Sequence, residues 1–286
     1  MLLVVLIHLL FLNGFKVSKV KWLYLLLILF STFSFSASKL EVGGGIFMAD
    51  IPHYLGSDQS EQYALPVPYI RYQSDDLDID RNSFTGYLWQ HGNLHLDISA
   101  GVSIAIDSKD NTAREGLDDL DWGFELGPSL NYYLIGTPQT KRHLYFGLFT
   151  RKAMATDFGS ITNVGWHYGP SVYFESPLLI TNDYELSTSI RANANFADDR
   201  YLNYYYGISL LDSSAERAEF NNRSGYSGSD LSIGINLDTK KYWLGGFVKY
   251  DYLANTKQQQ SPLVKQNSNV SLGFGVAWKF YTREGR

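Results

Sequence analysis

Short stretches in which every second residue is apolar constrain this chain more than any other feature. In the clearest of them, residues 122–134, the apolar side chains are Trp122, Phe124, Leu126, Leu130, Tyr132 and Leu134. Small or polar residues lie between them. Because successive side chains of a β-strand point to opposite faces, such a stretch has one apolar and one polar face. The alternation recurs up to the C-terminus and predicts an all-β fold.

Twelve stretches carry this strand signal. Tyr and Phe, present 21 and 17 times, favour strands over helices. A soluble barrel would show Lys and Glu on its polar face, but here that face holds mainly Gly, Ser, Ala and Asn. Both faces of the strands are explained if the apolar face contacts lipid and the polar face lines a lumen. We therefore expect an antiparallel up-and-down transmembrane β-barrel. The predicted strands are 39–49, 64–73, 76–81, 84–90, 94–106, 121–134, 142–156, 163–176, 184–195, 228–238, 241–253 and 269–281.

The connections between these strands support the same fold. Bacterial outer-membrane barrels have an even number of strands, short periplasmic turns and longer outer loops. With both chain ends in the periplasm, the predicted inner turns are 74–75, 91–93, 135–141, 177–183 and 239–240. The predicted outer connections are 50–63, 82–83, 107–120, 157–162, 196–227 and 254–268, which include the longest. This count requires the aromatic stretch 201–210 to lie in an outer loop, where it could form a hairpin above the membrane.

Residues 1–38 differ from the rest of the chain. Lys16, Lys19 and Lys21 precede an almost wholly apolar stretch at 22–35, and small residues follow. This is the order of a secretory signal peptide. A membrane anchor is the competing interpretation, but each apolar block is shorter than the roughly 20 residues that cross a bilayer as a helix. We therefore expect a signal peptide over residues 1–38, cleaved after Ser36 or Ser38, and one barrel domain over residues 39–286.

Composition and motifs argue against several classes of function. The net charge is −5, so a basic footprint for nucleic acid is missing. The chain has no cysteine for a disulfide framework or a thiolate metal site. Glu115, Asp118, Asp119 and Asp121 lack the spacing of a calcium loop, and no nucleophile elbow marks a hydrolase. We expect no catalytic residue, no metal site and no cofactor.

Charged residues on the polar face of the predicted strands would point into the lumen. Mixed charges in a narrow barrel can pair and fill it, or they can line a narrow pore. Barrels of eight strands are filled by side chains and barrels of sixteen are open. A barrel of twelve strands is intermediate in size, so the sequence allows either a filled barrel or a narrow pore. The candidate lumen residues are His95, Asp97, Glu125, Glu185, Arg191, Lys249 and Asp251.

Motifs along most of the chain resemble the MipA/OmpV family of outer-membrane proteins. The resemblance includes residues 117–119, residues 125–128 and a Ser-Pro-Leu-Val stretch that begins at Ser261 and Pro262. Its first motif follows a glycine-rich strand and consists of Pro52, Tyr54, Gly56, Ser57, Asp58, Leu65, Pro66 and Pro68. Because proline cannot donate a ladder hydrogen bond, Pro66 and Pro68 predict a bulged or loosely paired strand end.

The resemblance implies a non-enzymatic protein of the Gram-negative outer membrane. In this family the implied role is a scaffold between a lytic murein transglycosylase and a peptidoglycan synthase, or a surface antigen. We expect a monomer that contacts outer-membrane lipid, with murein-enzyme contacts on the turns 135–141 and 177–183. The alternatives are a narrow channel for small solutes and a surface adhesin that acts through the loops 107–120, 196–227 and 254–268.

Overall fold

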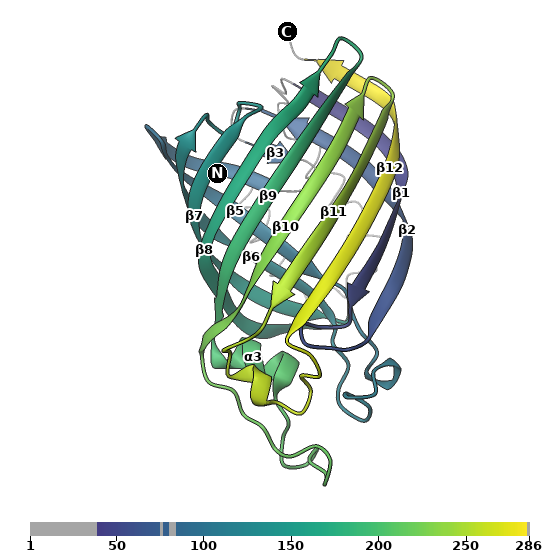
Figure 1. The fold of residues 1–286 in the computed structure, drawn as a ribbon, viewed down its shortest axis with the longest axis vertical. Helices are drawn as coiled ribbons and strands as arrows, with labels where there is room; N and C mark the ends of the chain where they lie inside the picture. Colours follow the sequence, from purple (N-terminus) through teal and green to yellow (C-terminus); the bar gives the residue numbers. More distant parts are fainter. Residues whose placement is uncertain (1–38, 75–76, 80–83, 285–286) are drawn as a thin grey trace, which may run out of the picture. The chain divides into compact units, whose positions relative to one another are not determined.

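The computed structural model describes residues 39–74, 77–79 and 84–284. They form a closed antiparallel β-barrel of twelve strands, in which sequence neighbours pair and the last strand pairs with the first (Figure 1). The predicted up-and-down barrel of twelve strands is confirmed. The predicted signal peptide, residues 1–38, lies outside the described residues. In the described part of the chain, no helix has the length and apolar character needed to cross a membrane.

Most strands are long enough to cross a bilayer when tilted, which takes about nine residues. Among the residues that the structure describes, only β3 and β4 form shorter strands. The strands are β1 (Lys39–Pro52), β2 (Ser60–Gln73), β3 (Leu77–Ile79), β4 (Phe84–His91), β5 (Leu94–Ser103), β6 (Trp122–Ile135), β7 (His143–Thr156), β8 (Ile161–Ile180), β9 (Tyr184–Ala197), β10 (Gly225–Thr239), β11 (Tyr242–Tyr252) and β12 (Ser268–Glu284).

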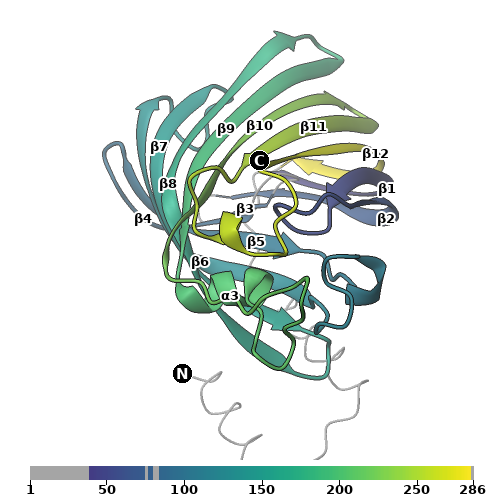
Figure 2. The same ribbon diagram turned by 60° about the horizontal axis from the view of Figure 1, so that its bottom comes forward.

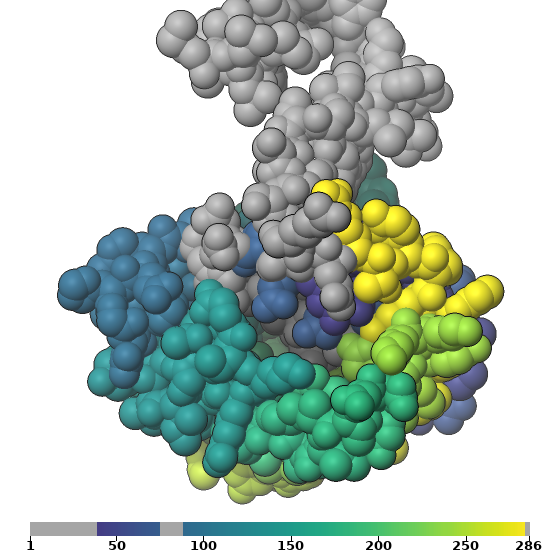
Figure 3. Space-filling model, turned by 90° about the horizontal axis from the view of Figure 1, so that it is seen from above, coloured from purple at the N-terminus to yellow at the C-terminus, as the bar shows by residue number. Residues whose placement is uncertain are grey.

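The two faces of the barrel wall follow the alternation in the sequence. Phe124 and Leu272, on the outside, are 39% and 49% exposed. Ser271, the neighbour of Leu272, is buried inside. Apolar side chains therefore point away from the lumen, as a barrel in lipid requires. We assign the end with the short turns to the periplasm, and Figure 3 views the barrel from this end.

Glycines allow close packing where the first and last strands meet. A Cβ atom on Gly45 would lie 2.1 Å from the carbonyl oxygen of Val276, and one on Gly43 would lie 2.2 Å from that of Trp278. The pairing of β1 with β12 also shifts register between Val42 and Gly43. Gly43 and Gly45 therefore let the two strands close the barrel, because a Cβ atom at either position would meet the β12 backbone.

The structure corrects one predicted turn and decides between the two interpretations of one strand end. The turn predicted at 177–183 is only 181–183, because β8 continues through a register shift after Pro177 as far as Ile180. Such a shift lets a strand pass a residue that cannot donate to the ladder. For Pro66 and Pro68 the sequence predicts a bulged or loosely paired strand end. The bulge is absent, because β2 pairs regularly with β1 along its whole length. The loose pairing holds on the other edge, where β2 pairs with β3 only near its end and no described residue of β3 pairs with either proline.

Candidate functional site

Long loops fold together across the outer mouth of the barrel, and we call them the cap (Figure 2). The cap consists of residues 53–59, 104–121, 198–224 and 253–267. It has a hydrophobic core of its own, which also includes Ala197 at the end of β9. Loops that share a buried core are held in place and do not move independently. The cap residues in this core are Tyr54, Ile106, Ala113, Leu120, Leu202, Tyr206, Ile208 and Leu263.

The aromatic stretch 201–210 is in an outer connection, as predicted, but the expected hairpin is wrong. Residues Asp199–Tyr206 form the helix α3. The side chain of Asp198 caps this helix by accepting a hydrogen bond from the Tyr201 amide at 2.8 Å. Leu202 and Tyr206, one helical turn apart, are buried in the cap core. The tyrosines of α3 thus stabilise the cap, and the exposed apolar tip of this loop is instead Leu211, which is 97% exposed.

The motif residues of the first outer loop bind the last outer loop and the start of β12. The Tyr54 hydroxyl donates to the Leu263 carbonyl oxygen at 2.7 Å, and the Gly56 amide donates to Asn269 Oδ1 at 2.7 Å. The Asn269 amide group in turn donates to the Ser57 carbonyl oxygen at 2.8 Å. Gly56 has a φ of +92°, which glycine adopts without strain. This part of the motif therefore joins two loops that are over 200 residues apart in the sequence.

Burial changes the titration of the groups inside the cap. Burial raises the pKa of Tyr54 to about 12, although the nearby Arg114 guanidinium opposes the shift. That guanidinium lies over the Tyr54 ring and donates to the Tyr205 carbonyl oxygen at 2.8 Å. Burial also raises the pKa of Tyr205 to about 12. The cap thus holds its phenols in the neutral form.

The other motif residues have varied surroundings. Ser261 lies in the cap and donates through its hydroxyl to the Tyr206 carbonyl oxygen at 2.8 Å. Pro262 beside it is half-buried, Pro52 is buried at the end of β1, and Asp58 is exposed. The remaining three are exposed positions on β2, namely Leu65, Pro66 and Pro68.

The acidic cluster of the sequence lies in the cap. Asp119 accepts a hydrogen bond from the Ser108 amide at 2.7 Å, and the main-chain oxygen of Asp118 accepts from Arg114. Asp121 lies next to Tyr204, whose hydroxyl accepts from its amide. Within residues 39–74, 77–79 and 84–284, no three acidic or histidine side chains are placed to hold a metal ion.

A polar cluster lies where α3 meets the barrel interior. Glu125 accepts from the Tyr201 hydroxyl at 2.9 Å and lies 2.9 Å from His167 Nδ1. The Tyr201 ring stacks on the His167 ring, with 5.3 Å between the ring centres. Arg151 lies 3.7 Å from Glu125 on the other side. Glu125 was a candidate from its place on the polar face, but nothing local in the sequence identifies His167 or Tyr201 as its partners.

The cluster separates two cavities inside the barrel. The cavity on the outer side has a volume of about 390 Å³ and extends under α3. The cavity on the periplasmic side has a volume of about 350 Å³ and a largely polar lining, which includes Asp97 and Arg191. Both volumes are in the range of small-molecule sites. Arg151 and His167 line both cavities, so the two meet at the level of the cluster.

The remaining candidate lumen residues form pairs at different heights. Lys249 Nζ lies 2.8 Å from Asp251 Oδ1, and both residues line the outer cavity. His95 is buried beside the Tyr133 ring, with 4.7 Å between the ring centres. Glu185 lies near the periplasmic end and pairs with Lys141 of the adjacent turn at 2.5 Å. The structure therefore distributes the seven candidates along the barrel instead of gathering them in one site.

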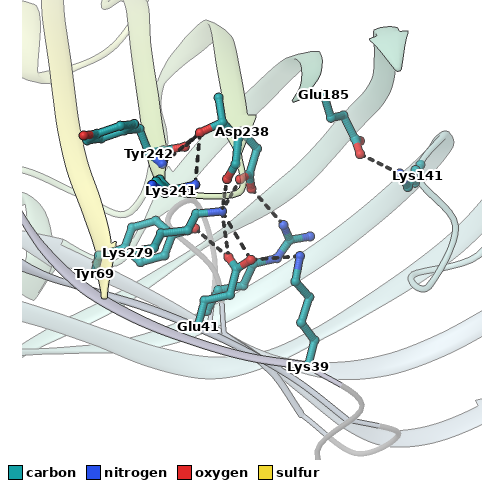
Figure 4. A network of polar contacts seen from close by, with 11 residues as sticks. Lys39, Glu41, Tyr69, Lys141, Glu185, Asp238, Lys241, Tyr242 and Lys279 are labelled. Atoms are coloured by element: carbon teal, nitrogen blue, oxygen red, sulfur yellow. Dashed lines mark hydrogen bonds and ion pairs between the residues drawn. The ribbon is translucent and has the colours of Figure 1, made fainter. Parts of the chain in front are cut away.

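A second polar cluster lies at the periplasmic end, where β1 meets β12 (Figure 4). The side chain of Lys279 is 1% exposed and forms ion pairs with Glu41, at 3.2 Å, and Asp238. Lys39 pairs with Glu41 at 3.0 Å, and Arg71 pairs with Asp238 at 3.1 Å. These five residues come from β1, β2, β10 and β12, so the cluster connects the strands on both sides of the closure.

One protein family matches almost the whole barrel. Its profile, described as MltA-interacting protein MipA, matches residues 42–280. The chain belongs to the MipA family. It is therefore an outer-membrane protein, as the apolar outer face of the barrel requires. No curated protein matches the sequence.

Solved structures that resemble the barrel include an outer-membrane secretin, a porin and a hydrocarbon channel. A bacterial polysaccharide outer membrane secretin is 8% identical, with a TM-score of 0.38 over 85% of this chain and 98% of its own. The NanC porin is 11% identical, with a TM-score of 0.34 over 84% and 100%. The CymD monoaromatic hydrocarbon channel is 10% identical, with a TM-score of 0.31 over 84% and 89%. At such low TM-scores none of them indicates a function for the MipA-family chain.

Proposed function

We propose that this MipA-family barrel is a non-enzymatic platform that binds a murein hydrolase of the MltA type at its periplasmic end. The observation that carries the proposal is the asymmetry of the barrel. The outer mouth is covered by the cap and its packed core, whereas the periplasmic end presents short turns with exposed charges. The family description, which names an interaction with MltA, supports a partner in the periplasm.

Three of the periplasmic turns together carry more basic than acidic residues. The turns 136–142, 181–183 and 240–241 contain four exposed basic side chains and one exposed acidic side chain, Asp183. Arg142 and Lys241 form no ion pair with any described residue. Basic turns favour a partner with an acidic face, and they speed encounter with it at low salt. The four basic residues are Lys141, Arg142, Lys240 and Lys241.

Charge reversal at this end tests the proposal. The triple variant Lys141→Glu/Arg142→Glu/Lys241→Glu should weaken binding of a purified MltA-type transglycosylase to the detergent-solubilised barrel about tenfold or more. The one ion pair lost, between Lys141 and Glu185, is exposed and contributes less than about 1 kcal/mol, so the barrel should still fold. Surface plasmon resonance at several salt concentrations measures the dissociation constant.

A matched variant at the opposite end serves as the control. Arg223, Lys257 and Lys265 are exposed in the outer loops, and reversing all three makes the same change in net charge. This control should bind the transglycosylase like the wild type. Equal loss in both variants, or in neither, would contradict a docking surface on the periplasmic turns.

A narrow channel is the second candidate function. The observation in its favour is that the two lumen cavities share Arg151 and His167 in their linings. The stacked pair of Tyr201 and His167 lies between them and would have to move for solutes to pass. In planar bilayers we expect no steady conductance from the wild type and measurable steps from Tyr201→Ala. Steady steps from the wild type itself would favour transport over docking.

A further inference from the structure

The charged turn residues of the proposed docking surface do not line the periplasmic cavity. It lies inside the barrel, below the turns that would bind a protein partner, and side chains from β5 to β11 line it. Figure 3 shows a hollow at this end of the barrel, bordered by teal, green and yellow atoms. We propose that this cavity binds a small carboxylated saccharide that enters from the periplasm.

One wall of the cavity is built of aromatic rings. Tyr133, Tyr145 and Tyr173 lie side by side on β6, β7 and β8, with 5.2 and 5.3 Å between neighbouring ring centres. His143 joins them, with its ring centre 5.6 Å from that of Tyr173. Tyr133 and Tyr173 are themselves buried, so the wall presents ring edges and phenol groups to the cavity. It suits a sugar ring, which has an apolar C–H face and hydroxyl groups around its edge.

Arg191 supplies a positive charge on this wall. Its guanidinium carbon lies 4.3 Å from the centre of the Tyr173 ring, and its Nη1 donates to the Tyr145 hydroxyl at 3.3 Å. A guanidinium has five N–H donors, and no described residue accepts a further hydrogen bond from this one. The Arg191 guanidinium is held flat on an aromatic ring and has unused N–H donors, so it can donate two parallel hydrogen bonds to the two oxygens of a carboxylate.

Asp97 lies in the same cavity lining and has an unused acceptor. Its Oδ2 accepts from the side-chain Nδ2 of Asn131 at 2.7 Å, whereas its Oδ1 has no hydrogen-bond partner among the described residues. The side chain is 1% exposed, and a buried polar atom without a partner is costly. A ligand hydroxyl that donates to Oδ1 would remove this cost. Asp97 thus favours a hydroxylated ligand, and Arg191 favours an acidic one.

Titration calorimetry with the full detergent-solubilised chain can separate these requirements. Glucuronate, glucose and acetate are the probes, because glucuronate combines the ring of glucose with a carboxylate. We expect glucuronate to bind at least about tenfold more tightly than either of the others. Glucuronate that binds no better than acetate, or no better than glucose, would overturn the proposal.

Variants place the binding in this cavity. Arg191→Gln should weaken glucuronate binding about tenfold or more, and Asp97→Ala should weaken it as well. Arg223→Gln, in the outer loop, removes the same charge away from the cavity and should change nothing. Arg191→Lys keeps the charge but loses the planar fork, and it provides an intermediate case if Arg191→Gln does not fold. Wild-type affinity in both Arg191 variants would overturn the assignment, whatever the periplasmic turns bind.

Discussion

Replacement of Lys279 tests how the barrel closes. This side chain is almost fully buried and lies between the carboxylates of Glu41 and Asp238, and its ammonium group also donates to the Thr239 carbonyl oxygen at 2.9 Å. Lys279→Met keeps most of the side-chain volume and removes the charge. Two acidic groups then lose a shared buried partner at the point where β12 meets β1.

The magnitude follows from the partners that remain. Removing one member of a buried ion pair typically costs about 3–5 kcal/mol, because the other charge stays buried without compensation. Here Glu41 keeps Lys39 and Asp238 keeps Arg71, so we expect a loss near the lower limit, about 3 kcal/mol of unfolding free energy. Lys39 is more exposed, and Lys39→Met should cost no more than about 1 kcal/mol.

Urea unfolding of the barrel in detergent micelles, followed by tryptophan fluorescence, measures both losses. At an unchanged slope, the shift in the midpoint gives the change in stability. The structural argument requires Lys279→Met to shift the midpoint at least about twice as far as Lys39→Met. Equal shifts would refute it, because they would mean that the buried ammonium group stabilises the closure no more than a surface charge.

Three further predictions concern the closure, the cap and the leader. Gly45→Ala should lower the free energy of unfolding by about 1–3 kcal/mol in the same urea experiment. Gly44→Ala should lower it less, because the nearest neighbour of the new Cβ atom would be the Phe280 ring at 3.7 Å. Equal losses would contradict the close approach of Gly45 to the β12 backbone. Burial raises the pKa of Tyr54 from 10.0 to about 12, so the contribution of Tyr54 to stability is present below pH 10 and is lost as the pH rises through 12. Tyrosinate absorbance should therefore show one late-titrating tyrosine fewer in Tyr54→Phe than in the wild type. An unchanged titration curve would contradict the raised pKa. Mass spectrometry of the mature protein should find an N-terminus at Ala37 or Lys39, and a retained leader would show that prediction to be wrong.

The strands could be predicted because their signal is local. Alternation with a period of two appears within each strand, and it fixes which residues face lipid and which face the lumen. Alternation accordingly predicts that Phe124 points to the outside of the barrel, where the structure has it. The end of β8 was misplaced because Pro177 looks like the start of a turn, and the register shift that carries the strand past it depends on pairing with β9.

The cap could not be predicted because its contacts are distant in the sequence. Tyr54 and Leu263 are 209 residues apart, and no local pattern links them. The polar contacts in the lumen could not be predicted for the same reason. Alternation places Glu125 inside the barrel, but its contacts with His167 and Tyr201 depend on the fold of a distant loop. Only the capping position of Asp198, directly before the aromatic stretch, could have suggested a helix there.

The position of α3 decides from which side the lumen can be reached. On the outer side, Tyr201 reaches into the barrel and its hydroxyl binds Glu125, so the route from outside passes through the packed core of the cap. On the periplasmic side, the cavity with Asp97 and Arg191 lies beyond this contact. A ligand that reaches Arg191 without disturbing the cap must therefore come from the periplasm. Loss of the Tyr201 hydroxyl in Tyr201→Phe should accordingly leave glucuronate binding at Arg191 unchanged, because that contact closes only the opposite route.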